Sequence, residues 1–308
     1  MSGKPIVVGV DGSAESVSAA VLAWRIAQAA SVPLHPVCAL PDLAAPGGYG
    51  PAWYGASDAE HVIVAATRQV AESLRGRLPE TVVEGLEVRL GHPARVLLET
   101  AAARKAGLVV VGGSRGKRGG STVQYLARTL DVPLLIHAGG PAAPERVLVA
   151  LDLSRAARDT LGEAAGVARL LEAELRAVHV VEPARFPRVV PAALDVVDFE
   201  RRSVEVFERV VRDSGVERVE REVRHGPAEE AIADEAAAWG ATLVVVGSHG
   251  KNFFERLLIG STTERLITLM PASLLVVPSA PARQPAAQRP ERDRPAVRRR
   301  PQARGRMP

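Results

Sequence analysis

Residues 147–154 read Val-Leu-Val-Ala-Leu-Asp-Leu-Ser, and they repeat the pattern of residues 6–13, Ile-Val-Val-Gly-Val-Asp-Gly-Ser. Each stretch is a short apolar run that ends in Asp-x-Ser, which is typical of a buried strand followed by a helix with a serine cap. A second repeated stretch, Leu-Val-Val-Val-Gly, occurs at residues 108–112 and again at 243–247. Because the spacing between the paired stretches is nearly constant, the sequence predicts two copies of one domain.

Within each copy, short apolar runs alternate with longer stretches of helical periodicity. This alternation predicts an α/β fold in which each copy is a doubly wound, Rossmann-like, five-stranded parallel sheet. Only 4% of the residues are aromatic, which suits parallel strands of Val, Leu and Ile covered by Ala-rich helices. In the second copy we expect strands near 146–151, 175–181, 216–224, 242–247 and 273–278, and helices near 155–172, 195–213, 227–239 and 261–269.

The domain boundaries follow from composition. We predict a first domain over residues 1–140 and a second over 144–279, joined by a Gly/Pro-rich stretch. Residues 280–308 are expected to form a disordered tail rich in Pro and Arg, because they contain too few apolar residues to fold. The net charge of the chain is +4, but residues 279–308 hold nine arginines against two acidic residues, so the rest is mildly acidic. The basic tail is the one part expected to attract nucleic acid.

Composition also excludes several classes of protein. The single cysteine, Cys38, excludes an internal disulfide framework and a cysteine-based zinc site. No apolar run approaches the roughly 18 residues of a membrane span, so no membrane partner is expected. We therefore expect a soluble, cytoplasmic protein.

Two loops of the second copy have the residues expected of a phosphate site. Asp152 follows the first strand and can accept hydrogen bonds from a ribose or an adenine. Gly247 and Gly250 follow the fourth strand and allow the backbone to approach a phosphate closely. Gly260 then precedes Ser261 at the start of a helix, whose free N–H groups attract anions. The Walker motif G-x-x-x-x-G-K-[ST] does not occur.

The spacing Gly247-x-x-Gly250, nine residues and then Gly260-Ser261 resembles the G-2x-G-9x-G-[S/T] motif of nucleotide-binding universal stress proteins. The resemblance covers nearly all of residues 4–278, and the two copies are similar to the tandem members of that family. It implies an ATP-binding, homodimer-forming stress-response protein, with or without Mg²⁺ beside the nucleotide. Carried over position by position, the resemblance implies contacts to adenosine from Ala150, Asp152 and Val180, and contacts to the phosphates from Gly247, His249, Gly250, Gly260, Ser261 and Thr262.

The first copy departs from this pattern. Asp11 stands where the second copy has Asp152, but only three residues separate Gly116 from Gly120, where the motif has nine. An extra glycine also precedes Ser114. The first copy is therefore expected to be degenerate and retained as a pairing surface, although basic residues in its short loop offer an alternative way to hold phosphate.

Three functions remain open at this stage. The first is a regulator in which ATP occupancy changes conformation or partner binding. The second is a slow ATPase, for which His249 is the one plausible acid–base group near the expected cradle. The third is an interaction scaffold that binds no nucleotide. No catalytic residue and no metal ligand is predicted, so the regulator is favoured.

The last strand of each copy bears on assembly. Residues 133–137 and 273–277 are apolar and would lie at sheet edges, which invite pairing. Pairing of the two edges within one chain would form a pseudo-dimer, and pairing between chains would form a homodimer. The sequence leaves both open.

Overall fold

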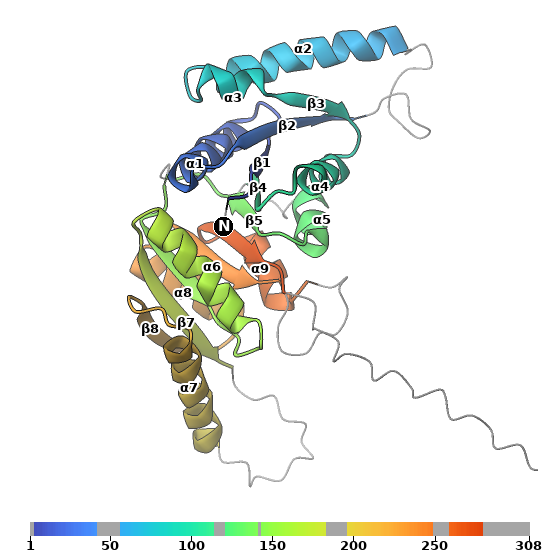
Figure 1. The fold of residues 1–308 in the computed structure, drawn as a ribbon. Coiled ribbons are helices and arrows are strands. Elements are labelled where there is room, and N and C mark those ends of the chain that lie inside the picture. The colour runs from blue at the N-terminus through green and yellow to red at the C-terminus, as the bar shows by residue number, and fades with distance from the viewer. Residues whose placement is uncertain are drawn as a thin grey trace, which may run out of the picture.

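The computed structural model describes residues 3–41, 56–113, 121–140, 143–182, 196–248 and 259–279. In these residues one ten-stranded sheet runs through both copies, with helices on its two faces (Figure 1). The first copy comprises β1 (Ile6–Gly9), α1 (Ala14–Ala30), β2 (Leu34–Leu40), α2 (Ala56–Leu74), α3 (Glu80–Glu84), β3 (Glu87–Leu90), α4 (Pro93–Arg104), β4 (Leu108–Gly112), α5 (Ser121–Thr129) and β5 (Leu134–His137). The second comprises β6 (Arg146–Ala150), α6 (Ala157–Leu170), β7 (Glu174–Val181), α7 (Val196–Asp213), β8 (Glu220–His225), α8 (Ala228–Trp239), β9 (Leu243–Gly247), α9 (Ser261–Leu269) and β10 (Ser273–Val277). The predicted tail, residues 280–308, lies outside the described residues.

The strand order confirms the predicted doubly wound fold. It runs β3-β2-β1-β4-β5-β10-β9-β6-β7-β8, so each copy contributes the same order of five strands. All pairs within a copy are parallel. The first and fourth strands of each copy are neighbours, and the connections leave them toward opposite sides. This is the switch point at which ligands collect in such sheets.

The two copies pair with each other inside one chain. Strands β5 and β10 are antiparallel, with Leu135 opposite Leu275 at the centre of the pairing. Both edges that the sequence left open are therefore occupied by this intrachain pairing. Because the pairing is antiparallel, the carboxyl end of β5 lies beside the start of β10.

Each face of the sheet has its own apolar core, and both cores extend across the two copies. Side chains alternate along each strand, so Val8 belongs to the core that lies under α1, α2, α6 and α7, whereas Val7 belongs to the core that lies under α4, α5, α8 and α9. Burial of each such side chain contributes about 1.5–3 kcal/mol. The predicted helices and strands of the second copy match closely, except that β8 begins at Glu220 instead of 216. The turn at Gly215, with φ of +72°, needs connecting residues before the strand can begin.

A buried polar group joins the copies beside the central pair of strands. His137, at the end of β5, is 1% exposed. Its Nδ1 lies 2.9 Å from the Ser273 hydroxyl of β10, and its Nε2 lies 3.0 Å from the Ser18 hydroxyl of α1. On the neighbouring helices, Arg128 of α5 and Glu264 of α9 form an ion pair at 3.0 Å. These contacts fix the register of one copy against the other.

His137 makes the stability of this junction pH-dependent. Burial lowers the pKa of His137 below its ordinary value of 6.5, so the folded protein binds a proton there less readily than the unfolded chain. The stabilisation is fully present above that value and is lost as the pH falls below it. Relative to His137→Gln, the wild type should lose unfolding free energy from pH 7.5 to 5, at up to about 1.4 kcal/mol per pH unit. Urea denaturation of both proteins measures the difference, in which the other titrating groups cancel, and parallel pH profiles would contradict the expectation.

Candidate functional site

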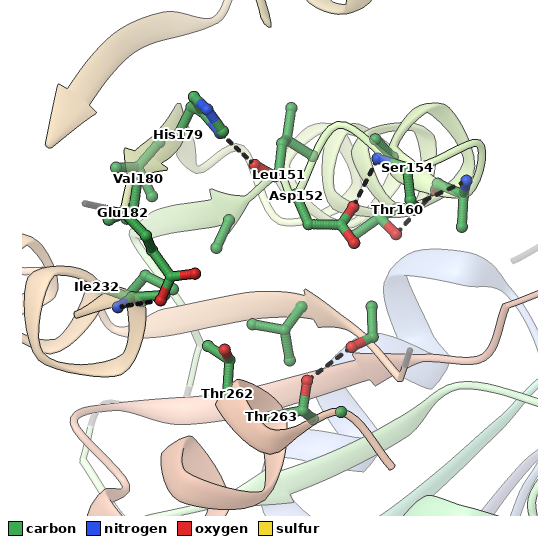
Figure 2. A pocket seen from close by; sticks show the side chains of 18 of the residues that line it. Leu151, Asp152, Ser154, Thr160, His179, Val180, Glu182, Ile232, Thr262 and Thr263 are labelled. Atoms are coloured by element: carbon green, nitrogen blue, oxygen red, sulfur yellow. Dashed lines mark hydrogen bonds between the residues drawn. The ribbon is translucent and has the colours of Figure 1, made fainter. Parts of the chain in front are cut away.

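The second copy has a pocket of about 310 Å³ at the carboxyl ends of β6 and β9, where the strand order reverses. Its walls come from the loop after β6, from β7, from the start of α8 and from the start of α9 (Figure 2). The pocket brings together most of the residues proposed from the sequence. These are Ala150, Asp152, Val180, Gly247, Gly260, Ser261 and Thr262. His249 and Gly250 lie outside the described residues.

Asp152 has one carboxylate oxygen without a partner. Its Oδ1 accepts a hydrogen bond from the backbone N–H of Ser154 at 3.0 Å. Its Oδ2 is buried and has no hydrogen-bond partner among the residues that the structure describes. A buried acceptor left without a donor costs roughly 1–3 kcal/mol. The next residue, Leu153, has a φ of +61°, which is a left-handed backbone conformation that residues other than glycine rarely adopt. Unpartnered polar groups and backbone strain of this kind gather at binding sites.

The serine after Asp152 does not have the role that the sequence predicted. Ser13 caps α1 as expected, with its hydroxyl accepting from the N–H of Ser16. Helix α6, however, begins after Ala156, and the Ser154 hydroxyl accepts from the N–H of Ala156 within the preceding turn. The Ser154 hydroxyl is therefore used in this turn and gives no hydrogen bond to Asp152. This turn is the local reason that the two copies differ at their first loop.

The start of α9 forms the opposite side of the pocket. Its N-cap is Gly260, and no side chain caps its first N–H groups. The hydroxyl of Thr263 donates to the carbonyl of Gly247 at 2.8 Å, which fixes the first turn of α9 to the end of β9. Uncapped N–H groups at a helix start form a favourable site for an anion. The sequence reasoning missed Thr263, and its place directly after the motif was the available signal.

The third wall comes from β7 and α8. Val180 and Glu182 lie on the same side of the chain and face the pocket (Figure 2). The Oε1 atom of Glu182 accepts from the N–H of Ala228 at 3.2 Å, so this carboxylate is held at the start of α8. Glu182 was also missed from the sequence, because nothing in its neighbourhood distinguishes it from a solvent-exposed residue.

His179 lines the pocket, but both of its ring nitrogens form hydrogen bonds within the protein. Its Nδ1 donates to the carbonyl of Leu151 at 2.8 Å, and its Nε2 lies 2.7 Å from the Ser203 hydroxyl. Its ring stacks on Phe207 of α7. Both ring nitrogens are thus engaged, as is typical of a buried histidine with a structural role.

The first copy has a pocket at the equivalent place, with a volume of about 390 Å³. Asp11 lines it, but the Oδ1 atom of Asp11 accepts from both the N–H and the hydroxyl of Ser13, at 2.9 and 2.5 Å. Burial opposes ionisation of this carboxyl, but the hydrogen bonds from Ser13 and Ser16 outweigh it and hold the pKa of Asp11 below its ordinary value. The short loop at residues 114–120 lies outside the described residues.

The comparison with known proteins agrees with this duplicated geometry. A sequence model of the universal stress protein family matches residues 3–137 and again residues 144–278. The chain belongs to the universal stress protein family. The two matches together make it a tandem member, with one family domain in each copy.

Individual relatives of this universal stress protein are distant. A Staphylococcus epidermidis protein that carries the family name is 27% identical over 143 residues, which are 43% of this chain and 83% of the relative. Among solved structures, a universal stress protein from Archaeoglobus fulgidus is 19% identical with a TM-score of 0.62, covering 91% of this chain and 100% of that one. A Pseudomonas aeruginosa structure titled as a family member is 17% identical with a TM-score of 0.57, covering 89% and 93%. At these identities the structures support the fold alone.

Within the described part of this universal stress protein, no cluster of three or more His, Cys, Asp or Glu side chains could hold a metal ion. Across those same residues, no helix has the length and hydropathy needed to cross a membrane.

The extra glycine of the first copy has a packing role. A Cβ atom on Gly113 would lie 2.7 Å from Cγ2 of Ile136 and 3.2 Å from Cε of Met270. Gly113→Ala should therefore lower the unfolding free energy by about 1–3 kcal/mol, because the strand residue Ile136 has little room to move. Gly162→Ala is the matched control, since its Cβ would meet nothing within 4 Å and should stabilise α6 by about 0.5–1 kcal/mol. Equilibrium urea denaturation measures both, and equal effects would refute the packing role.

Proposed function

We propose that this universal stress protein is a cytoplasmic regulator that binds one ATP, in the pocket of its second copy, and signals through the state of that pocket. The observation that carries the proposal is the buried Oδ2 of Asp152, which has no partner within the described part of the chain and belongs to a pocket whose far side is an uncapped helix start. An acceptor at one side suits the amino or hydroxyl donors of adenosine. Free N–H groups at the other side suit phosphate.

The remaining walls support the same ligand. Val180, Ile232 and Ala150 provide an apolar surface for a flat base between the two polar sides. The hydroxyls of Ser261 and Thr262 stand at the phosphate side, where they would add donors or face a Mg²⁺ ion carried by the nucleotide. The volume of about 310 Å³ lies within the usual range of small-molecule sites.

The chemistry of the pocket favours a binding regulator over an ATPase. Hydrolysis needs a group that positions or activates water beside the terminal phosphate. Among the described lining residues, His179 has both ring nitrogens engaged, and Glu182 is held at the start of α8. Slow turnover and a scaffold role therefore remain the alternatives. Binding of ATP excludes the scaffold, and the absence of phosphate release from bound ATP excludes the slow ATPase.

The phosphate side is tested by a matched pair of substitutions. Thr262→Asp places a carboxylate in the first turn of α9, where it favours the helix dipole but repels phosphate. ATP affinity should fall by at least about tenfold, whereas Thr122→Asp, at the equivalent position of α5, should leave it unchanged. Isothermal titration of ATP, with and without Mg²⁺, into each full-length protein gives affinity and stoichiometry. Two ATP per wild-type chain, or no ATP, would overturn the proposal.

The adenosine side is tested at the two first-strand aspartates. Asp152→Ala removes the acceptor proposed to meet the ligand, and ATP affinity should fall by about 10- to 100-fold, as expected for a hydrogen bond to a charged group. Asp11→Ala is the control, since it removes the equivalent carboxylate from the other copy. Isothermal titration of both variants decides the matter. If Asp11→Ala lowered the ATP affinity and Asp152→Ala did not, the nucleotide would bind in the first copy and the proposal would be wrong.

A further inference from the structure

The pocket of the first copy differs from that of the second in its walls. Three apolar side chains line it that have no equivalent in the other pocket, namely Ile136 of β5 and, from the second copy, Ile267 and Met270. Their repeat-related counterparts, Val276, Ala127 and Leu130, do not line the second pocket. The first pocket is therefore built from both copies, whereas the second is built from one.

The antiparallel pairing of β5 with β10 produces this composite wall. It places the start of β10 beside the carboxyl end of β5, and α9 ends just before β10 begins. Ile267 and the C-cap residue Met270 are thereby brought to the pocket of the first copy. Gly113 admits the Met270 side chain, since a Cβ there would meet its Cε at 3.2 Å. The second copy has the buried Ser248 at the equivalent position.

The polar wall of the first pocket also differs. Glu15 lines it, at the position where the second copy has Ala156. The backbone of Glu15 packs against the end of β4, because a Cβ on Gly112 would lie 2.7 Å from the Glu15 carbonyl carbon. The end of β4 corresponds to Gly247, where the phosphate loop of the second copy begins. Glu15 and Asp11 are thus two acidic residues among those that line this pocket, and negative charge there disfavours phosphate.

We propose that the first-copy pocket is a second, composite ligand site for an uncharged molecule of nucleoside size. The hydroxyl or amino donors of this molecule face Asp11 and Glu15, and its apolar ring packs against Ile136, Ile267 and Met270. The volume of about 390 Å³ lies within the usual range of small-molecule sites, so the pocket can hold a body of this size. Asp11 remains ionised at neutral pH because its pKa is lowered, and it therefore acts as an acceptor.

The experiment uses adenosine as the neutral probe and a reporter inside the composite wall. The chain has three methionines, and Met270 is the one among the described residues. In the full-length protein labelled with [¹³C]methyl-methionine, adenosine should shift the Met270 methyl resonance in a saturable way, and Met270→Leu assigns that signal. The same titration with ATP is made in Thr262→Asp, so that the second pocket does not contribute.

Matched tryptophan substitutions locate the probe. Ala39→Trp fills the first pocket from β2, and Val180→Trp fills the second from the equivalent position of β7. Ala39→Trp should raise the adenosine concentration that gives a half-maximal shift by at least about tenfold, because the indole occupies the pocket. Val180→Trp should leave that concentration unchanged. Urea denaturation confirms that both variants are folded.

The charge of the site is tested at Glu15. Glu15→Ala introduces the residue that the second copy has at this position. It should lower the ratio of adenosine affinity to ATP affinity by at least about fivefold. A Met270 methyl that adenosine leaves unmoved, a shift abolished by Val180→Trp instead of Ala39→Trp, or equal binding of ATP and adenosine in Thr262→Asp would each overturn the proposal. Failure of ATP to bind the wild type would count against the proposed function alone, because this site does not use it.

Discussion

The antiparallel pairing of β5 with β10 is the constraint on which the rest of the structure depends. Each copy is a parallel sheet whose last strand would otherwise expose a row of unpaired backbone groups and apolar side chains. Pairing these two edges provides hydrogen-bond partners for the backbone groups, buries the apolar side chains and extends one sheet across both copies. It also merges the apolar layers, so that each face of the sheet has a core to which both copies contribute. The buried His137, between Ser18 and Ser273, fixes this pairing with directional bonds.

The same pairing determines how the two pockets are built. Antiparallel strands direct the carboxyl ends of the two half-sheets to opposite edges, so each copy keeps its own pocket. Helix α9 runs between these edges. Its first turn, fixed by the bond from Thr263 to Gly247, lines the second pocket, and its last residues reach the first. One short helix is therefore part of both sites.

Much of this arrangement could be predicted from the sequence, because it rests on local patterns. The repeated Asp-x-Ser stretches and the alternation of apolar runs with helical periodicity determined the fold class and the element positions. The glycine spacing after β9 indicated where the walls of the second pocket converge. The resemblance to universal stress proteins rested on that spacing and is confirmed by the two family matches.

Features that depend on contacts between distant residues could not be predicted in this way. The sequence left open whether the edge strands pair within or between chains, since apolar residues favour either. It marked an extra glycine at 113 without revealing Met270 as its neighbour, because they are far apart in sequence. It also treated Ser13 and Ser154 as equivalent, although the left-handed Leu153 and the turn at Ala156 change the second loop. The first two differences arise from packing between distant residues, whereas the third arises from the backbone conformation of a turn that the Asp-x-Ser pattern does not encode.

Fusion of the two copies has a consequence for how such a protein can diverge. In a dimer of identical subunits a substitution appears at both symmetry-related positions, so Gly113 and Ser248, or Leu130 and Met270, could not differ. A single chain removes that restriction and lets each half change alone. The connection from His137 to Arg146 is also short, which holds the partner strand at an effective concentration on the order of millimolar. Dilution therefore does not separate the halves, and the asymmetry persists at any abundance in the cell.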